Sequence, residues 1–184
     1  MSRPGSSGDH RLQPDRSYVH YLLAYSRVHF AAAVIADGSD GGYSQYLQFL
    51  NAHQFTAADS EALNGGMPFG SGLLYWLRRS PEFSLDMVNT AVMFQVSSPY
   101  ILPGMWAPFV GLRRLGKPVE LIYFPTGSHI QQKPQDRLAS QGGSVDWFVF
   151  WLKGEEDADP FKIDKYKRWR RLRALASRAG TGME

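Results

Sequence analysis

The sequence predicts an α/β fold, with a mostly parallel sheet flanked by helices, and two observations lead to this class. Three apolar runs of strand length occupy 30–38, 89–96 and 117–125. Stretches with the apolar spacing of a helix separate these runs along the chain. Apolar strands that alternate with helices are typical of a parallel sheet that is covered on both faces and connected by right-handed crossovers.

The first half of the chain begins with a segment that shows no structural period. Residues 1–16 are rich in Gly, Ser, Pro and charge, which predicts disorder. "SYVHYLLAYS" (17–26) has helical spacing behind Ser17, a candidate N-cap, and the run at 30–38 is a buried strand that ends at Asp37-Gly38. Two further helices are predicted at 43–51 and 71–79, separated by the loop "LNGGMPFGSG".

The second half repeats the alternation of strand and helix. A strand at 89–96 precedes a helix at 105–116 that Gly116 closes, and the third strand follows, with 118–124 expected in the interior of the sheet. A long helix is predicted within 133–154, with Gly154 as its C-cap and an apolar stripe formed by Val145, Phe148, Val149 and Leu152. The acidic linker "GEEDADP" leads to a last helix at about 161–178 and a tail at 179–184.

Composition limits the classes of function. A chain of 184 residues with 43% hydrophobic content can bury one sizeable core. The lack of cysteine excludes disulfides, Cys-ligated zinc and thiol nucleophiles. No apolar run approaches the roughly 18 to 20 residues of a membrane span, and the N-terminus lacks the apolar middle of a secretory signal. We therefore expect a soluble chain with no membrane partner. The sequence does not identify its compartment.

A single histidine follows the third predicted strand, in "VELIYFPTGSHI" (119–130). Ligands of open α/β sheets bind beyond the carboxyl ends of the strands, so His129 lies where function is usually found. The turn through Thr126, Gly127 and Ser128 would present its ring in a crevice. The alternative is structural, because His129 could also cap the next helix or form a surface hydrogen bond.

Four long segments resemble the prolyl oligopeptidase family of serine peptidases, especially bacterial members. They are "FAAAVIADGSDGGYSQYL", "NGGMPFGSGLLYWLRRSPEFSLDMVNTAV", "GLRRLGKPVELIYFPTGSH" and "QDRLASQGGSVDWFVFWLKGEEDADPFKIDKYKRWRRLR". The similarity runs from about residue 18 to residue 175. It implies that 17–178 is part of an α/β-hydrolase domain and that 1–16 is not family-like. The chain would then be either the C-terminal portion of a larger protein or a truncated reading frame. A full member would also carry an N-terminal propeller.

The resemblance implies that His129 is the general base of a Ser-His-Asp triad, which takes the serine proton and returns it to the leaving amine. The serine elbow of such a fold reads Gly-x-Ser-x-Gly, and this chain has none. The elbow is expected near residues 11–16, which read "RLQPDR". Ser17 is the nearest serine, but the bulky neighbours Arg16 and Tyr18 favour an N-cap instead.

The acid of the implied triad is also missing from its expected loop. Family enzymes present it after the strand that corresponds to 89–96, yet no carboxylate lies between Asp86 and Glu120. Asp37 and Asp40 follow the earlier strand and are the candidate acids. The pattern favours a turn role for each of them, because "ADGSDGG" is typical of turns.

The interpretation is therefore a partial catalytic domain of a serine-type peptidase, for which the full-length family would take peptide substrates and which should be inactive in isolation. Its missing strands should leave a sheet edge open to self-association. One alternative is an inactive interaction module on a hydrolase scaffold. Another is a nucleic-acid-binding protein, because 162–178 carries eight basic residues against one acid, +7 within a chain of net charge +3.

The competing explanation of that basic segment is a packed terminal helix. Its aromatic and aliphatic residues recur every three positions and would face the domain while the basic side chains face water; they are Ile163, Tyr166, Trp169, Leu172 and Leu175. We favour packing and expect no nucleic-acid partner. The five histidines, His10, His20, His29, His53 and His129, are spread out without metal-ligand spacing, and "NGGMPFGSG" matches no nucleotide motif, so no metal or cofactor is implied.

Overall fold

The structure, a computed structural model, describes residues 17–38, 42–48, 57–97 and 99–181. Its centre is a parallel sheet of β1 (Ala32–Ala36), β2 (Ala91–Val96) and β3 (Val119–Tyr123), in the order β1-β2-β3. This confirms the parallel sheet and all three predicted strands. The interior position expected for 118–124 is wrong, because β3 lies at an edge of the described sheet and β2 is the central strand.

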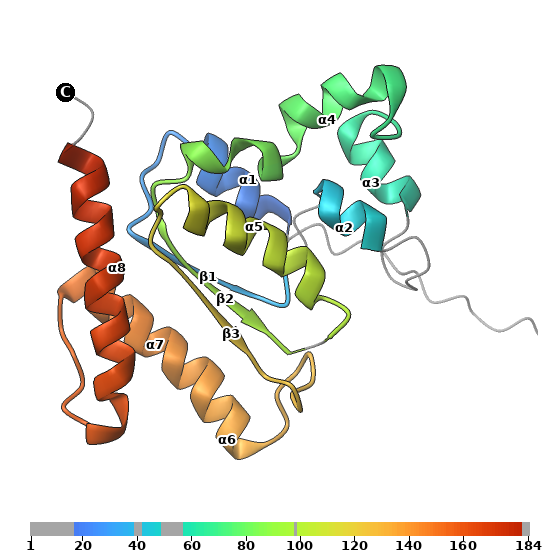
Figure 1. The fold of residues 1–184 in the computed structure, drawn as a ribbon. Coiled ribbons are helices and arrows are strands. Elements are labelled where there is room, and N and C mark those ends of the chain that lie inside the picture. The colour runs from blue at the N-terminus through green and yellow to red at the C-terminus, as the bar shows by residue number, and fades with distance from the viewer. Residues whose placement is uncertain (1–16, 39–41, 49–56, 98, 182–184) are drawn as a thin grey trace, which may run out of the picture.

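Helices cover both faces of this sheet. α1 (Ser17–Tyr25) and α5 (Leu102–Arg114) lie on one face, and α7 (Gly143–Phe148) and α8 (Ile163–Thr181) lie on the other (Figure 1). Side chains of β2 alternate between the two layers: Val92 and Phe94 pack with α5, whereas Met93 packs with α7 and α8. All six residues of β2 are buried, so this strand belongs to both cores.

The described parts of the segment between β1 and β2 are mostly helical and lie on the α5 side of the sheet in Figure 1. It contains α2 (Tyr43–Gln48), α3 (Ala57–Asn64), α4 (Leu73–Arg79) and two 3₁₀ helices, Gly70–Gly72 and Pro81–Met87. Trp76 of α4 is fully buried against the rings of Tyr43 and Tyr46. The prediction of α2 and α4 is confirmed, but α3 and the 3₁₀ helix after α4 were not predicted.

One continuous helical segment follows the turn after β3. It consists of α6 (Pro134–Arg137), a π-helical stretch (Leu138–Gly142), α7 and a second π-helical stretch (Val149–Lys153), and it ends at Gly154 with φ +76°. The predicted apolar stripe is wrong, because Val145 and Leu152 are 60% and 62% exposed. The fully buried residues are Trp147 and Phe150.

The last helix, α8, follows a 3₁₀ turn at Pro160–Lys162 and continues to Thr181, three residues past its expected end. Tyr166 and Trp169 are buried and Leu172 is half-buried, which confirms the docking face. Ile163 and Leu175 are exposed, so their predicted packing is wrong. The predictions for residues 1–16 lie outside the described part of the chain.

Basic side chains of the α8 region are paired with acids of the same chain. The pairs are Lys162 with Asp146 and Asp157, Lys165 with Asp146, Arg168 with Glu120, and Arg170 with Glu156. The hydrogen bond to Asp157 is the largest cause that raises the pKa of Lys162 above its ordinary value. This pairing favours the packing explanation of the segment over a phosphate-binding surface.

Candidate active site

The carboxyl ends of the three strands bring together three polar side chains. Asp37 directly follows β1, Ser97 directly follows β2, and His129 lies six residues beyond the end of β3. The register pairs Ala36 with Gln95, so Asp37 and Ser97 meet where the two strands end. This is the edge at which the sequence placed His129 and the candidate acid Asp37. The other candidate, Asp40, lies outside the described residues.

Hydrogen bonds from the end of β2 fix the Asp37 carboxylate. Its backbone has φ +43°, in the left-handed region, and its N–H donates to the carbonyl of Gln95 over 2.8 Å. Oδ1 accepts the backbone N–H of Ser97 over 2.7 Å, and Oδ2 accepts the Ser97 hydroxyl. Only 5% of the Asp37 side chain is exposed. Because both oxygens act as acceptors, the site suits the ionised carboxylate.

His129 reaches the same carboxylate from the loop after β3. Its Nδ1 lies 3.3 Å from Asp37 Oδ2, and 47% of its side chain is exposed. A tight turn holds this loop, because Gly127 N–H donates to the carbonyl of Phe124 over 3.0 Å. A Cβ at Gly127 would lie 3.0 Å from the Cβ of Phe124, so a larger residue would fit there only if its neighbours shifted. The ring is therefore fixed at Nδ1 and partly open to solvent.

This arrangement has the geometry of an imidazole with a buried carboxylate at its Nδ1. A buried carboxylate at Nδ1 holds the imidazole in the tautomer whose Nε2 can accept a proton. A nucleophile is not seen among the described side chains near this pair. Ser97 donates its hydroxyl to Asp37, so it is not oriented toward His129 as a nucleophile would be. Ser17 is the first residue of α1, and its side chain is outside the described part of the structure.

No family model matches the chain. It is 31% identical over 165 residues to the lasso peptide isopeptidase AtxE2 of Asticcacaulis excentricus, an alignment that covers 77% of this chain and 23% of the isopeptidase. Two solved structures of AtxE2 isopeptidase, each 30% identical, match 87% of this chain and 24% of their own. The TM-score is 0.70 for a serine-to-alanine variant with Astexin3-dC4 bound and 0.68 for the apo form.

Over this region, the chain is similar to a member of the prolyl oligopeptidase family of serine peptidases. Its three parallel strands and flanking helices form part of an α/β-hydrolase-type fold. The chain spans about a quarter of the length of the relatives that it matches. It therefore corresponds to a partial catalytic domain of this family.

The prolyl oligopeptidase family resemblance did not identify Ser97 or Gln95, which lie at the end of β2. Gln95 is buried, and its Nε2 donates to the carbonyl of Ser140 over 2.9 Å and to the hydroxyl of Ser144 over 3.0 Å. The Ser140 hydroxyl donates to Gln95 Oε1 over 2.7 Å. Gln95 thus connects the end of β2 by hydrogen bonds to the helical segment that follows the His129 loop. Two polar residues in the otherwise apolar run "AVMFQVS" were the available signal.

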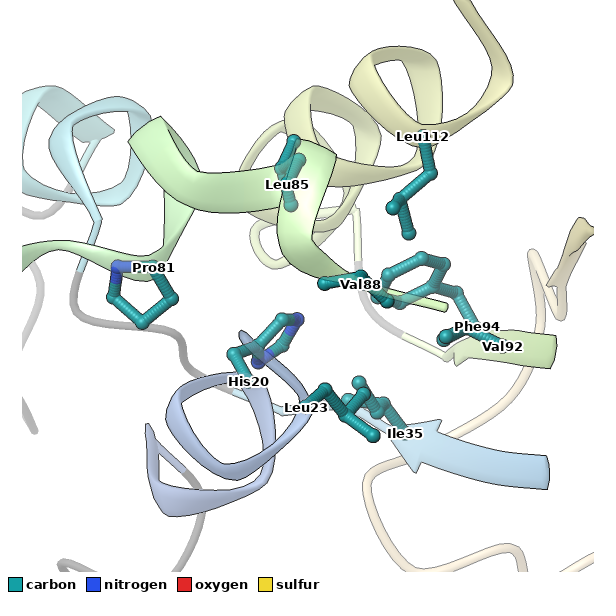
Figure 2. A pocket seen from close by; sticks show the side chains of 9 residues that line it. All are labelled: His20, Leu23, Ile35, Pro81, Leu85, Val88, Val92, Phe94 and Leu112. Atoms are coloured by element: carbon teal, nitrogen blue, oxygen red, sulfur yellow. The ribbon is translucent and has the colours of Figure 1, made fainter. Parts of the chain in front are cut away.

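A small cavity lies away from this pair, between α1, β1, β2 and α5 (Figure 2). Its volume of about 10 Å³ is near the least that holds one water molecule. His20 of α1 points into it among apolar side chains, and neither ring nitrogen has a hydrogen-bond partner among the described residues. Burial is the main cause that lowers the pKa of His20 to about 4, against the opposing charge of Glu82. The cavity is too small for a peptide.

The described residues offer neither a metal-binding cluster nor a membrane-spanning helix. No group of three or more His, Cys, Asp or Glu side chains in this part of the chain could hold a metal ion. No helix there has both the length and the apolar character needed to cross a bilayer.

Proposed function

We propose that this chain contributes the base and the acid of a serine-peptidase active site, His129 and Asp37, and that a nucleophile outside the described side chains completes it. The contact of His129 Nδ1 with Asp37 Oδ2 at 3.3 Å carries this proposal, because the carboxylate is buried and the ring is half-open. In the reaction, Nε2 of His129 takes the proton of the attacking hydroxyl and later gives it to the leaving amine. Asp37 stabilises the imidazolium that forms between these steps.

The proposed substrate of the whole protein is a peptide. The relative AtxE2 is named a lasso peptide isopeptidase, and one of its structures has Astexin3-dC4 bound. An isopeptide bond is an amide, so its hydrolysis needs the same protonation of a leaving amine that His129 would provide. This supports amide hydrolysis on a peptide.

We expect the 184-residue chain alone to be unreactive toward a fluorophosphonate probe. A serine hydrolase depends on nucleophile, base and acid acting as a unit, and the elbow also supplies an oxyanion-hole donor. Intact-mass spectrometry after incubation with the probe measures the result. Stoichiometric labelling at Ser17 that His129→Ala abolishes would show instead that the chain holds a complete site.

A chimera tests the proposed pair directly. This chain would replace the matching quarter of AtxE2 isopeptidase, so that the remainder supplies the other parts of the site. We expect the chimera to react with the probe, and His129→Ala or Asp37→Asn to slow the reaction by about 10²- to 10⁴-fold. His29→Ala is the matched control, since His29 is exposed and precedes β1 at the other end of the strand. A chimera that reacts equally well without His129 would refute the proposal.

The proposal includes self-association through the edge of β1. β1 reads "AAVIA", with neither charge nor proline to protect its free edge, and it pairs only with β2 among the described strands. Successive N–H groups along a strand point to opposite sides. The N–H of Asp37 points to β2, so the N–H of Ala36 points away from β2. α7, which packs against β1, also exposes Val145. Two copies could therefore pair their β1 strands.

We expect a concentration-dependent dimer in sedimentation equilibrium at micromolar protein. Ala36→Pro should shift the chain to monomer, because proline removes the outward donor, whereas Ala36→Ser retains it and should leave the dimer unchanged. Far-ultraviolet circular dichroism checks that both variants are folded. A wild-type chain that stays monomeric up to about 100 μM, a concentration at which even a weak pair would assemble, contradicts the expectation.

A further inference from the structure

The orientation of the Asp37 carboxylate depends on one residue of the central strand. Asp37 lies just past an edge strand, where its own backbone does not determine which oxygen faces His129. Ser97 bonds both oxygens, with its N–H on Oδ1 and its hydroxyl on Oδ2. Two bonds from one residue to the two oxygens of one carboxylate fix the plane of that group.

The contact between Ser97 and Asp37 is almost fully buried. Ser97 is 2% exposed and Asp37 is 5% exposed. Water therefore has little access to replace a lost donor, and a buried carboxylate without donors is strongly destabilised. The Ser97 hydroxyl also bonds the same oxygen, Oδ2, that lies next to the His129 ring, so it holds negative charge where the imidazole needs it.

The end of β2, which carries Ser97, is held by hydrogen bonds on two sides. The N–H of Asp37 donates to the carbonyl of Gln95, which holds the ends of β1 and β2 together. The buried Gln95 side chain bonds Ser140 and Ser144 of the helical segment behind the site. Ser97 therefore directly follows a strand whose end is held in place by hydrogen bonds.

We infer that Ser97 is a positioning residue that holds the Asp37 carboxylate so that Oδ2 meets Nδ1 of His129. The inference rests on the proposed function of the Asp37 and His129 pair. Ser97 acts through Asp37 and does not touch the reacting atoms.

The tautomer of His129 reports on this role without requiring activity. The ring nitrogens of the ¹⁵N-labelled 184-residue chain are observed by NMR at a pH where the ring is neutral, and His129→Gln assigns the signals. In the wild type we expect the Nδ1–H tautomer, since the carboxylate accepts that proton. Ser97→Ala should remove the low-field Nδ1–H signal or reduce it at least by about half, and Ser97→Thr, which restores a hydroxyl, should recover it.

Two further variants separate the explanations. Ser80→Ala deletes another fully buried hydroxyl, one without a partner among the described residues, and should leave the His129 signals unchanged. Asp37→Asn should abolish the Nδ1–H tautomer. If Asp37→Asn has no effect, the proposed pair is wrong; if it has the expected effect but Ser97→Ala does not, the pair stands and the role of Ser97 is overturned. Loss of the signal in folded Ser97→Thr would also overturn it.

Discussion

Replacing Trp169 with alanine should lower the free energy of unfolding by about 3 to 5 kcal/mol, the range for large aromatic residues in cores. Trp169 is fully buried, and its ring lies 5.1 Å from Trp147, 5.3 Å from Tyr166 and 5.6 Å from Phe150 between ring centroids. Its Nε1–H also donates to Glu120 of β3. One side chain therefore connects α8, the α7 segment and the sheet. Urea denaturation followed by circular dichroism measures the loss.

Two related variants divide this effect. Trp169→Phe keeps an aromatic ring but removes the bond to Glu120, which should cost about 1 to 3 kcal/mol. Ile163→Ala, on the same helix but 59% exposed, should change stability by no more than about 0.5 kcal/mol. If Trp169→Ala melts like the wild type while binding to duplex DNA collapses, the packing explanation of α8 is wrong.

Acid should destabilise the fold through His20. The pKa of this histidine is about 4 in the folded chain, against an ordinary value of 6.5, chiefly because burial disfavours the charged ring. The unfolded chain therefore binds a proton at a higher pH than the folded chain does. Stability falls as pH decreases from about 6.5 to about 4, and the total loss from this group is about 3 kcal/mol. Glu82, whose charge favours protonation, offsets only part of the burial.

His20→Leu removes this titration and should fit, because the cavity around residue 20 is lined by apolar side chains (Figure 2). We expect the variant to gain stability relative to the wild type as pH falls, with most of the difference developing between pH 6.5 and 4. Urea midpoints at pH 7.5 and 4.5 measure it. His29→Gln, at an exposed histidine, should keep the wild-type dependence. Parallel pH profiles of wild type and His20→Leu would contradict the assignment to His20.

Local patterns were sufficient to predict the class of fold, because the apolar runs are short and helical spacing separates them. They also placed His129 and Asp37 beyond strand ends. The order of strands was not predictable in this way. β2 reads "AVMFQV" and β3 reads "VELIY", so each is an apolar run with one polar residue, but β3 is an edge strand whose Glu120 bonds Trp169 of α8. Position within a sheet depends on partners, and single runs do not encode them.

The predicted stripe at Val145 and Leu152 failed for a geometric reason. It assumed the period of 3.6 residues, but π-helical stretches lie on both sides of α7 and contain more residues per turn. The face that meets the sheet is consequently shifted, and Trp147 and Phe150 occupy it. Helical periodicity predicts the element but loses the buried face when the helix changes type.

The role inferred for Ser97 depended on a contact that spans 60 positions of the chain. A serine after a strand is common and carries no signal of its own. Only the register of β1 on β2 brings its N–H and hydroxyl to Asp37. His129 and two candidate acids, Asp37 and Asp40, could therefore be named from sequence, whereas Ser97 required the structure.

The left-handed backbone of Asp37 has an evolutionary consequence. Asp and Asn adopt positive φ more readily than other residues with a side chain, so the turn accepts either at φ +43°. The backbone at this position therefore accepts Asp or Asn, whereas only Asp supplies the negative charge. Within the proposed site, a single Asp-to-Asn replacement would remove the charge and retain the fold, and one reversion would restore the charge.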